Sequence, residues 1–167
     1  YPANSKNESV NVEGYEFNFP RQLVDKGPDK INYSLADFIS PDQDWIGMFA
    51  VTTGKGIEDI ILEFEKDNDD YRIIMIKAIA DRLAEAFAEK LHQMIRVDYW
   101  GYSTEKNMSI EQLIKEKYNG IRPAPGYPAC PSHEEKDKIW EILDVEKEIG
   151  IILTESRAMY PAASVSG

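Results

Sequence analysis

The 167-residue sequence contains a single cysteine, Cys130, and no long apolar run. One cysteine cannot form an intrachain disulfide, so a reducing compartment is expected. No run reaches the roughly 18 apolar residues needed to span a bilayer, and the first residues lack the basic and apolar regions of a secretion signal. We therefore expect a cytoplasmic protein with no membrane partner.

Positive charge is also scarce, with 19 basic against 30 acidic residues and a net charge of −11. An acidic chain repels phosphate, so nucleic acid is not an expected partner. The hydrophobic content of 43% argues against disorder and is sufficient for a core. The chain opens without an initiator methionine and closes on small residues, so we expect residues 1–167 to be a single partial domain of a larger protein.

Common catalytic and metal-binding patterns are missing. The glycines of residues 54–56 have neither the dinucleotide-binding nor the P-loop spacing. His92 and His133 are far apart and, with one cysteine, do not make a metal-ligand set. Cys130 lies near His133 and leaves a cysteine-dependent hydrolase open, but its alanine and proline neighbours cannot stabilise a thiolate, which favours a packed cysteine.

Hydrophobic periodicity predicts an α+β fold in which strands and helices are segregated along the chain. Strands are expected over residues 10–19 with an interruption at Gly14, over 45–51 as a central buried strand, and over 151–154, with loop after them. Helices are expected over residues 57–64, 71–96, 110–118 and 133–148. Ser109 with Gln112, and Ser132 with Glu135, match the capping-box pattern.

The long predicted helix, residues 71–96, contains neither glycine nor proline. Apolar side chains recur along it at the spacing of a long helix: Ile74, Ala78, Leu83, Phe87, Leu91 and Ile95. Its middle, residues 84–89, is rich in alanine, so a neighbouring element or a ligand can approach that part closely.

Proline is concentrated in one segment, since four of the nine prolines fall within residues 122–131. Each proline fixes φ and removes an N–H, which gives a stiff loop with outward-facing carbonyls. Such a loop holds Arg122 and Tyr127 in fixed relative positions and suits a small polar ligand with a carboxylate. The alternative is a surface connector.

Carboxylates are expected around Arg122. Glu116 lies on the preceding short helix, while Glu85 and Glu89 lie one turn apart on the long helix. If the proline loop packs against that helix, these acids would surround a cationic group while Arg122 pairs with a carboxylate. A zwitterionic ligand with an additional positive centre satisfies both demands, and a solvated acidic face is the alternative.

Three segments closely resemble the activation domain of cobalamin-dependent methionine synthase: ADRLAEAFAE (residues 80–89), GIRPAPGYPA (120–129) and LTES (153–156). The resemblance runs through the whole chain. It implies a C-shaped α+β domain with a twisted antiparallel sheet flanked by helices, here truncated at both ends. It also implies binding of S-adenosylmethionine and docking onto the cobalamin-binding domain of the same enzyme. There cob(II)alamin would be reduced by flavodoxin or a related reductase and methylated.

The family's R-x-x-x-G-Y signature is matched by Arg122, Gly126 and Tyr127. By resemblance, Arg122 holds the methionine carboxylate, backbone groups at Ala124 contact the ligand, and Tyr127 lines its pocket. The resemblance also matches two acids to family positions near the ligand or the docked cofactor, namely Glu85 and Glu116.

The family domain extends beyond this chain at both ends, with an aspartate ligand contact on one side and a tyrosine pair on the other. We therefore expect the isolated chain to bind S-adenosylmethionine weakly and to be inactive alone. A second hypothesis is a non-catalytic docking module that contacts a corrinoid protein or a flavodoxin-like reductase through its acidic surface.

Overall fold

The computed structural model describes residues 1–23, 27, 31–105 and 108–167. Helices and antiparallel strands make up the fold, so the predicted α+β class is confirmed. The chain forms two compact units, Tyr1–Ala50 with Pro123–Ala162 and Ser166–Gly167, and Val51–Arg122 with Ala163–Val165. That residues 1–167 act as a single domain stays a prediction.

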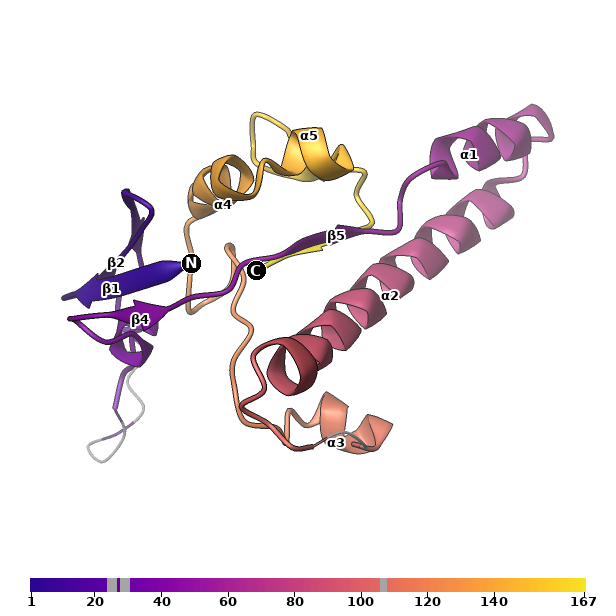
Figure 1. Cartoon of the computed structure of the whole chain (residues 1–167). Coiled ribbons are helices and arrows are strands. Elements are labelled where there is room, and N and C mark those ends of the chain that lie inside the picture. The colour runs from indigo at the N-terminus through magenta and orange to yellow at the C-terminus, as the bar shows by residue number, and fades with distance from the viewer. Residues whose placement is uncertain (24–26, 28–30, 106–107) are drawn as a thin grey trace. The chain divides into compact units, whose positions relative to one another are not determined.

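A four-stranded antiparallel sheet in the order β3-β2-β1-β4 opens the first unit (Figure 1). Its strands are β1 (Pro2–Lys6), β2 (Ser9–Val12), β3 (Tyr15–Asn18) and β4 (Asp44–Trp45). Glu13 and Gly14 turn the chain between β2 and β3 with positive φ angles of 51° and 86°. The predicted strand over residues 10–19 is therefore a hairpin, broken at the glycine where an interruption was expected.

Two helices complete the first unit, α4 (Glu135–Leu143) and α5 (Val145–Ile149). Ile139 and Trp140 of α4 share a buried core with Val10 and Phe17, and the indole N–H of Trp140 donates to the Ile151 carbonyl at 2.8 Å. The single predicted helix over residues 133–148 is wrong, because a left-handed residue at position 144 (φ 49°) separates α4 from α5. Helix α5 ends at Ile149, and Gly150 follows with a positive φ of 68°.

The capping box predicted at Ser132 is also wrong. The hydroxyl of Ser132 accepts from the N–H of Glu134 at 3.2 Å, two residues on. The carboxylate of Glu135 does not reach back to the cap; it accepts from Lys138 Nζ at 2.6 Å and is 3% exposed. A partly buried ion pair therefore takes the place of the reciprocal cap expected from the sequence.

The central buried strand predicted over residues 45–51 is wrong as well. β4 ends at Trp45, which is 54% exposed, and β5 (Ala50–Thr52) belongs to a different sheet, where it pairs with β8 (Ser164–Ser166). Ile46 and Met48 pack against the core of the first unit, whereas Val51 belongs to the second. The apolar residues of this run therefore pack into two different cores. For this reason the run is continuous in the sequence although it does not form one strand.

The C-terminal residues contain more strand than predicted. β6 (Ile152–Leu153) confirms the strand expected there and pairs with β7 (Met159–Tyr160) in an antiparallel hairpin. β7 and β8 fall in the stretch expected as loop. Each is only two or three residues long, too short for alternation to be recognised in the sequence.

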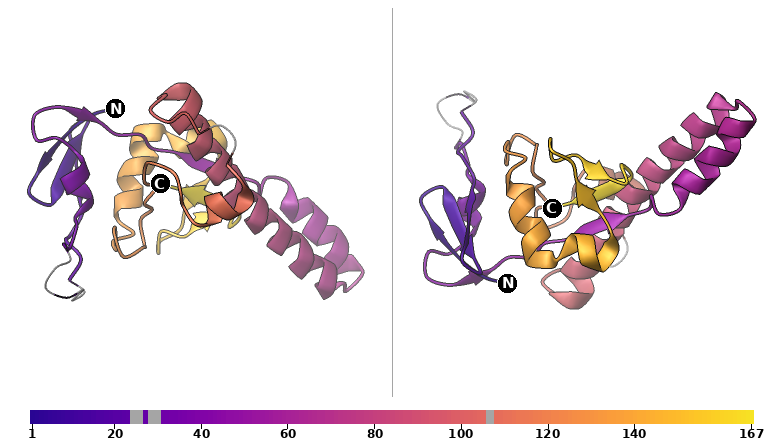
Figure 2. Two further views of the ribbon diagram at one scale, coloured as in Figure 1. Left: turned by 90° about the horizontal axis from the view of Figure 1, so that it is seen from below. Right: turned by 90° about the horizontal axis from the view of Figure 1, so that it is seen from above.

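In the second unit, α1 (Ile57–Lys66) and α2 (Asp70–Met94) run side by side in both views of Figure 2. A π-helical turn, η2 (Ile95–Tyr99), continues α2, and α3 (Ile110–Ile114) follows. The helices predicted here are confirmed, although α3 ends before Tyr118. The Ser109 and Gln112 capping box is confirmed, with the two reciprocal bonds at 3.3 and 2.8 Å. No helix in the described part of the chain is long and apolar enough to cross a membrane.

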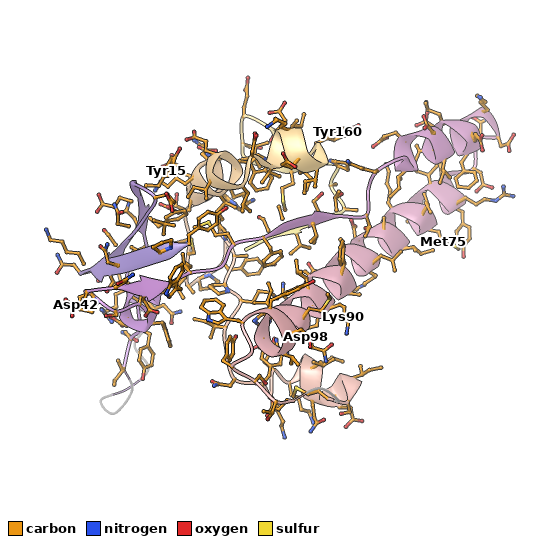
Figure 3. All side chains as sticks on the ribbon, viewed as in Figure 1. Tyr15, Asp42, Met75, Lys90, Asp98 and Tyr160 are labelled. Atoms are coloured by element: carbon orange, nitrogen blue, oxygen red, sulfur yellow. The ribbon has the colours of Figure 1, made fainter. Side chains whose placement is uncertain are left out.

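The buried face of α2 is made mainly of alanines. Ala80, Ala84 and Ala88 are 3% exposed or less, and Thr53, just after β5, donates its hydroxyl to the Ala80 carbonyl at 2.7 Å. Large apolar side chains of α2 are exposed instead: Tyr71, Ile74, Met75, Ile79, Leu83 and Phe87. Figure 3 shows Met75 on the outer surface of the helix. Small side chains thus bring the α2 backbone close to its neighbour. Of the apolar stripe along the helix, four residues are exposed and two are half-buried, Leu91 and Ile95.

Candidate ligand-binding site

The six predicted site residues divide between the two units. Glu85, Glu116 and Arg122 belong to the second, where Arg122 is the final residue before the chain returns to the first unit at Pro123. The other three are in the first unit: Ala124, Gly126 and Tyr127.

Arg122 forms a loose ion pair with Glu89 of α2. Its Nη2 lies 3.5 Å from Glu89 Oε2, and the two side chains are 22% and 26% exposed. A charge-assisted hydrogen bond is shorter, about 2.7–2.9 Å. Among the described residues, buried Arg122 Nε and Glu89 Oε1 have no hydrogen-bond partner. An unsatisfied buried donor costs about 1–3 kcal/mol, and Nε of Arg122 is such a donor.

Glu85 and Glu116 are both exposed. Glu85 lies on α2, one turn before Glu89, and Glu116 follows α3 with a positive φ of 48°. The carboxylate that the structure brings to Arg122 is that of Glu89. Burial raises the pKa of the Tyr118 hydroxyl, and the charges of Glu89 and Glu116 raise it further, so both acids act on the residues just before Arg122.

A buried polar cluster at the end of α2 was not expected from the sequence. Arg96 is 1% exposed, its Nη1 lies 2.6 Å from Nδ1 of His92, and its guanidinium carbon lies 3.7 Å from the centroid of the Tyr118 ring. The rings of His92 and Tyr118 meet edge to face at 5.3 Å. The i, i+4 spacing of His92 and Arg96 is the one sequence signal for this cluster.

The proline segment forms a closed turn. The N–H of Gly126 donates to the Cys130 carbonyl at 2.7 Å, and the N–H of Cys130 donates to the Tyr127 carbonyl at 2.9 Å. Gly126 has a φ of +100°, and a Cβ there would collide with the ring of His133. The expectation of outward-facing carbonyls is wrong for Tyr127 and Cys130, whose carbonyls are used within the loop, whereas the Tyr127 side chain is 64% exposed.

Residues 1–167 match the family model described as vitamin B12 dependent methionine synthase, activation domain. The chain belongs to this family. A solved structure described as the MetH reactivation domain bound to AdoHcy is 50% identical to it, with a TM-score of 0.93. The match covers 100% of this chain and 55% of that one, so the chain spans about half the length of this structural neighbour. The resemblance inferred from the three sequence segments is confirmed.

In this member of the activation-domain family, Cys130 is a packed residue. It is 2% exposed, and burial, reinforced by the nearby Glu135 carboxylate, raises the pKa of its thiol to about 11. A thiol with that pKa is protonated at neutral pH and is a poor nucleophile. The described residues also contain no group of three histidine, cysteine or carboxylate side chains able to hold a metal ion.

Proposed function

We propose that this activation domain binds S-adenosylmethionine and presents its methyl group for the reductive methylation of cobalamin in a methionine synthase. The observation that carries the proposal is the unpaired buried N–H of Arg122, the arginine of the R-x-x-x-G-Y signature. AdoHcy, which the structural neighbour holds, is the product that S-adenosylmethionine leaves after losing its methyl group.

The chemistry of these residues fits the ligand. A carboxylate placed at Arg122 Nε would accept the hydrogen bond that this donor lacks. Glu85, Glu89 and Glu116 would supply negative potential for the ammonium and sulfonium groups. The resemblance adds two further ligand contacts, the side chain of Tyr127, which is 64% exposed, and backbone groups at Ala124.

When bound, S-adenosylmethionine supplies an electrophilic methyl group to the reduced cobalt held by a neighbouring domain. The residues of this chain contribute binding and orientation, which accelerate a reaction by removing translational and rotational freedom. The proposed partners are the cobalamin-binding domain of the same enzyme and, as electron donor, flavodoxin or a related reductase in the cytoplasm. Because the matching solved chain is longer, we expect weak binding by the 167-residue chain alone, and the parent enzyme is the appropriate material for tests.

Replacing Arg122 tests the proposal. In the parent enzyme, calorimetric titration with S-adenosylmethionine should show about 10- to 100-fold weaker binding for Arg122→Ala. This is the loss in affinity expected when one charge-assisted hydrogen bond is removed. Arg122→Lys should fall between this variant and wild type, because lysine keeps the charge but loses the planar fork. Lys90→Ala, at an exposed position on α2, is the matched control. Unchanged affinity in Arg122→Ala would refute the proposal.

The exposed apolar side chains of α2 favour a second candidate function, a non-catalytic docking module. Under that alternative, Leu83→Glu on the exposed face would weaken association with the partner protein, and Arg122→Ala would leave association unchanged. Under the first proposal, Arg122→Ala weakens ligand binding about 10- to 100-fold and impairs reactivation. Measuring both properties on both variants separates the two functions.

A further inference from the structure

Three polar side chains form a row along the end of α2 and the π-helical turn that continues it. Glu89, His92 and Arg96 are spaced i, i+3 and i+7, which places them on one face of the helix. His92 is 6% exposed and Arg96 is 1% exposed. Burying a guanidinium is costly unless the group is well engaged, so the contacts of Arg96 indicate what this row does.

Each member of the row contacts the segment that carries Arg122. Glu89 pairs with Arg122 itself, and His92 meets the edge of the Tyr118 ring. Arg96 covers the face of the same ring at 3.7 Å, well inside the roughly 6 Å limit for a cation–π contact. Residues 118–122 are therefore held at both ends by one helix face.

The middle of this segment is equally confined. Gly120 has a φ of +119°, and a Cβ there would lie 2.5 Å from the hydroxyl of Tyr102 and 3.4 Å from Cδ of Arg96. The methylene stem of Arg96 thus packs against Gly120 while its head stacks on Tyr118. A side chain at position 120 would therefore crowd both Tyr102 and Arg96.

We propose that Arg96 is a positioning residue for the ligand-binding arginine: by fixing Tyr118 and Gly120, it sets where the Arg122 guanidinium points. This inference rests on the proposed function. Arg96 itself is too deeply buried to touch a ligand. Arginine is required here because its planar head stacks on a ring and donates to His92 at once, which the compact ammonium of lysine cannot do.

The test compares Arg96→Lys, Tyr118→Leu and Tyr118→Phe in the parent enzyme. Arg96→Lys and Tyr118→Leu should each weaken binding of S-adenosylmethionine about tenfold and raise its KM in reactivation, with kcat at saturation unchanged. Tyr118→Phe keeps the aromatic ring, so its affinity for S-adenosylmethionine should stay within about twofold of the wild-type value. The double variant Arg96→Lys with Tyr118→Leu should be little worse than either single one, because both remove the same contact.

Lys90→Ala, on the same turns of α2, is the matched control and should bind like wild type (its position is labelled in Figure 3). Wild-type affinity in folded Tyr118→Leu, or equal losses in Tyr118→Leu and Tyr118→Phe, would overturn the inference even if Arg96→Lys fails to fold. If these variants bind normally while Arg122→Ala does not, the positioning role alone fails. If wild type does not bind the ligand, the proposed function fails and this inference fails with it.

Discussion

Nη1 of Arg96 lies 2.6 Å from Nδ1 of His92 inside the second unit. A guanidinium carries only donors, so Nδ1 accepts and the ring proton is on Nε2. Burial, together with the charges of Arg96 and Arg122, lowers the pKa of His92 to about 4. The imidazole is therefore neutral at pH 7, and a proton on Nδ1 would break its contact with Arg96.

This arrangement predicts that His92 destabilises the fold in mild acid. Its pKa is about 4 in the folded protein against 6.5 unfolded. Between these values the unfolded chain binds more protons, so the free energy of unfolding falls as pH drops from 6.5 to 4, by on the order of 3 kcal/mol in total. Urea unfolding at pH 7 and pH 4.5 should show a smaller loss for His92→Gln than for wild type. Equal losses in His92→Gln and wild type would contradict the prediction.

The alanine face of α2 predicts intolerance of larger side chains. Ala84 is 1% exposed, whereas Ala78 on the same helix is exposed. Ala84→Leu should lower the free energy of unfolding by about 1–3 kcal/mol through overpacking. Ala78→Leu should change it by less than about 0.5 kcal/mol. Chemical denaturation of both variants measures this difference, and similar values for the two would show that the alanine face is not tightly packed.

Gly126 should resist substitution for two separable reasons. Its φ is +100°, which disfavours any side chain, and a Cβ would enter the ring of His133. Gly126→Ala should lower the melting temperature and weaken ligand binding. Adding His133→Ala removes the collision but not the backbone strain, so the double variant should recover only part of the loss. Full recovery would mean that the backbone strain is negligible.

The thiol of Cys130 should be unreactive in the folded protein. With 2% exposure and a pKa raised to about 11, it offers neither access nor a thiolate. Ellman's reagent should react slowly under native conditions and within seconds in urea. Cys130→Ser should retain reactivation, and loss of reactivation in a folded Cys130→Ser protein would revive the cysteine-dependent hydrolase.

Local patterns predict α1 and α2 well, because a long stretch without glycine or proline leaves few alternatives to helix. They do not predict which face of α2 is buried. Large apolar residues at helical spacing usually mark the core, yet here alanines do, because the chain at Thr53 approaches the helix closely enough to bond the Ala80 carbonyl. The alanine-rich middle of α2 indicates that a neighbour can approach closely, but the tertiary fold decides that the chain at Thr53 does so.

The candidate site, too, is predicted only in part from the sequence. Arg122, Gly126 and Tyr127 are found from one local signature, and the proline segment indicates a rigid loop. The pairing of Arg122 with Glu89, and the stacking of Arg96 on Tyr118, depend on the fold bringing residues 89–96 against residues 118–122. The resemblance points to Glu85, whereas the structure pairs Arg122 with Glu89; a ligand role for Glu85 stays a prediction.

The π-helical turn at Ile95–Tyr99 sets a limit on how this helix can evolve. The N–H of Trp100 donates to the Ile95 carbonyl at 2.8 Å, a step of five residues where an α-helix takes four. Removing one residue from this turn would restore ordinary helical winding and rotate everything after it by about 100° relative to Arg96. Insertions and deletions should therefore be rarer in these five positions than in the neighbouring loops of related chains.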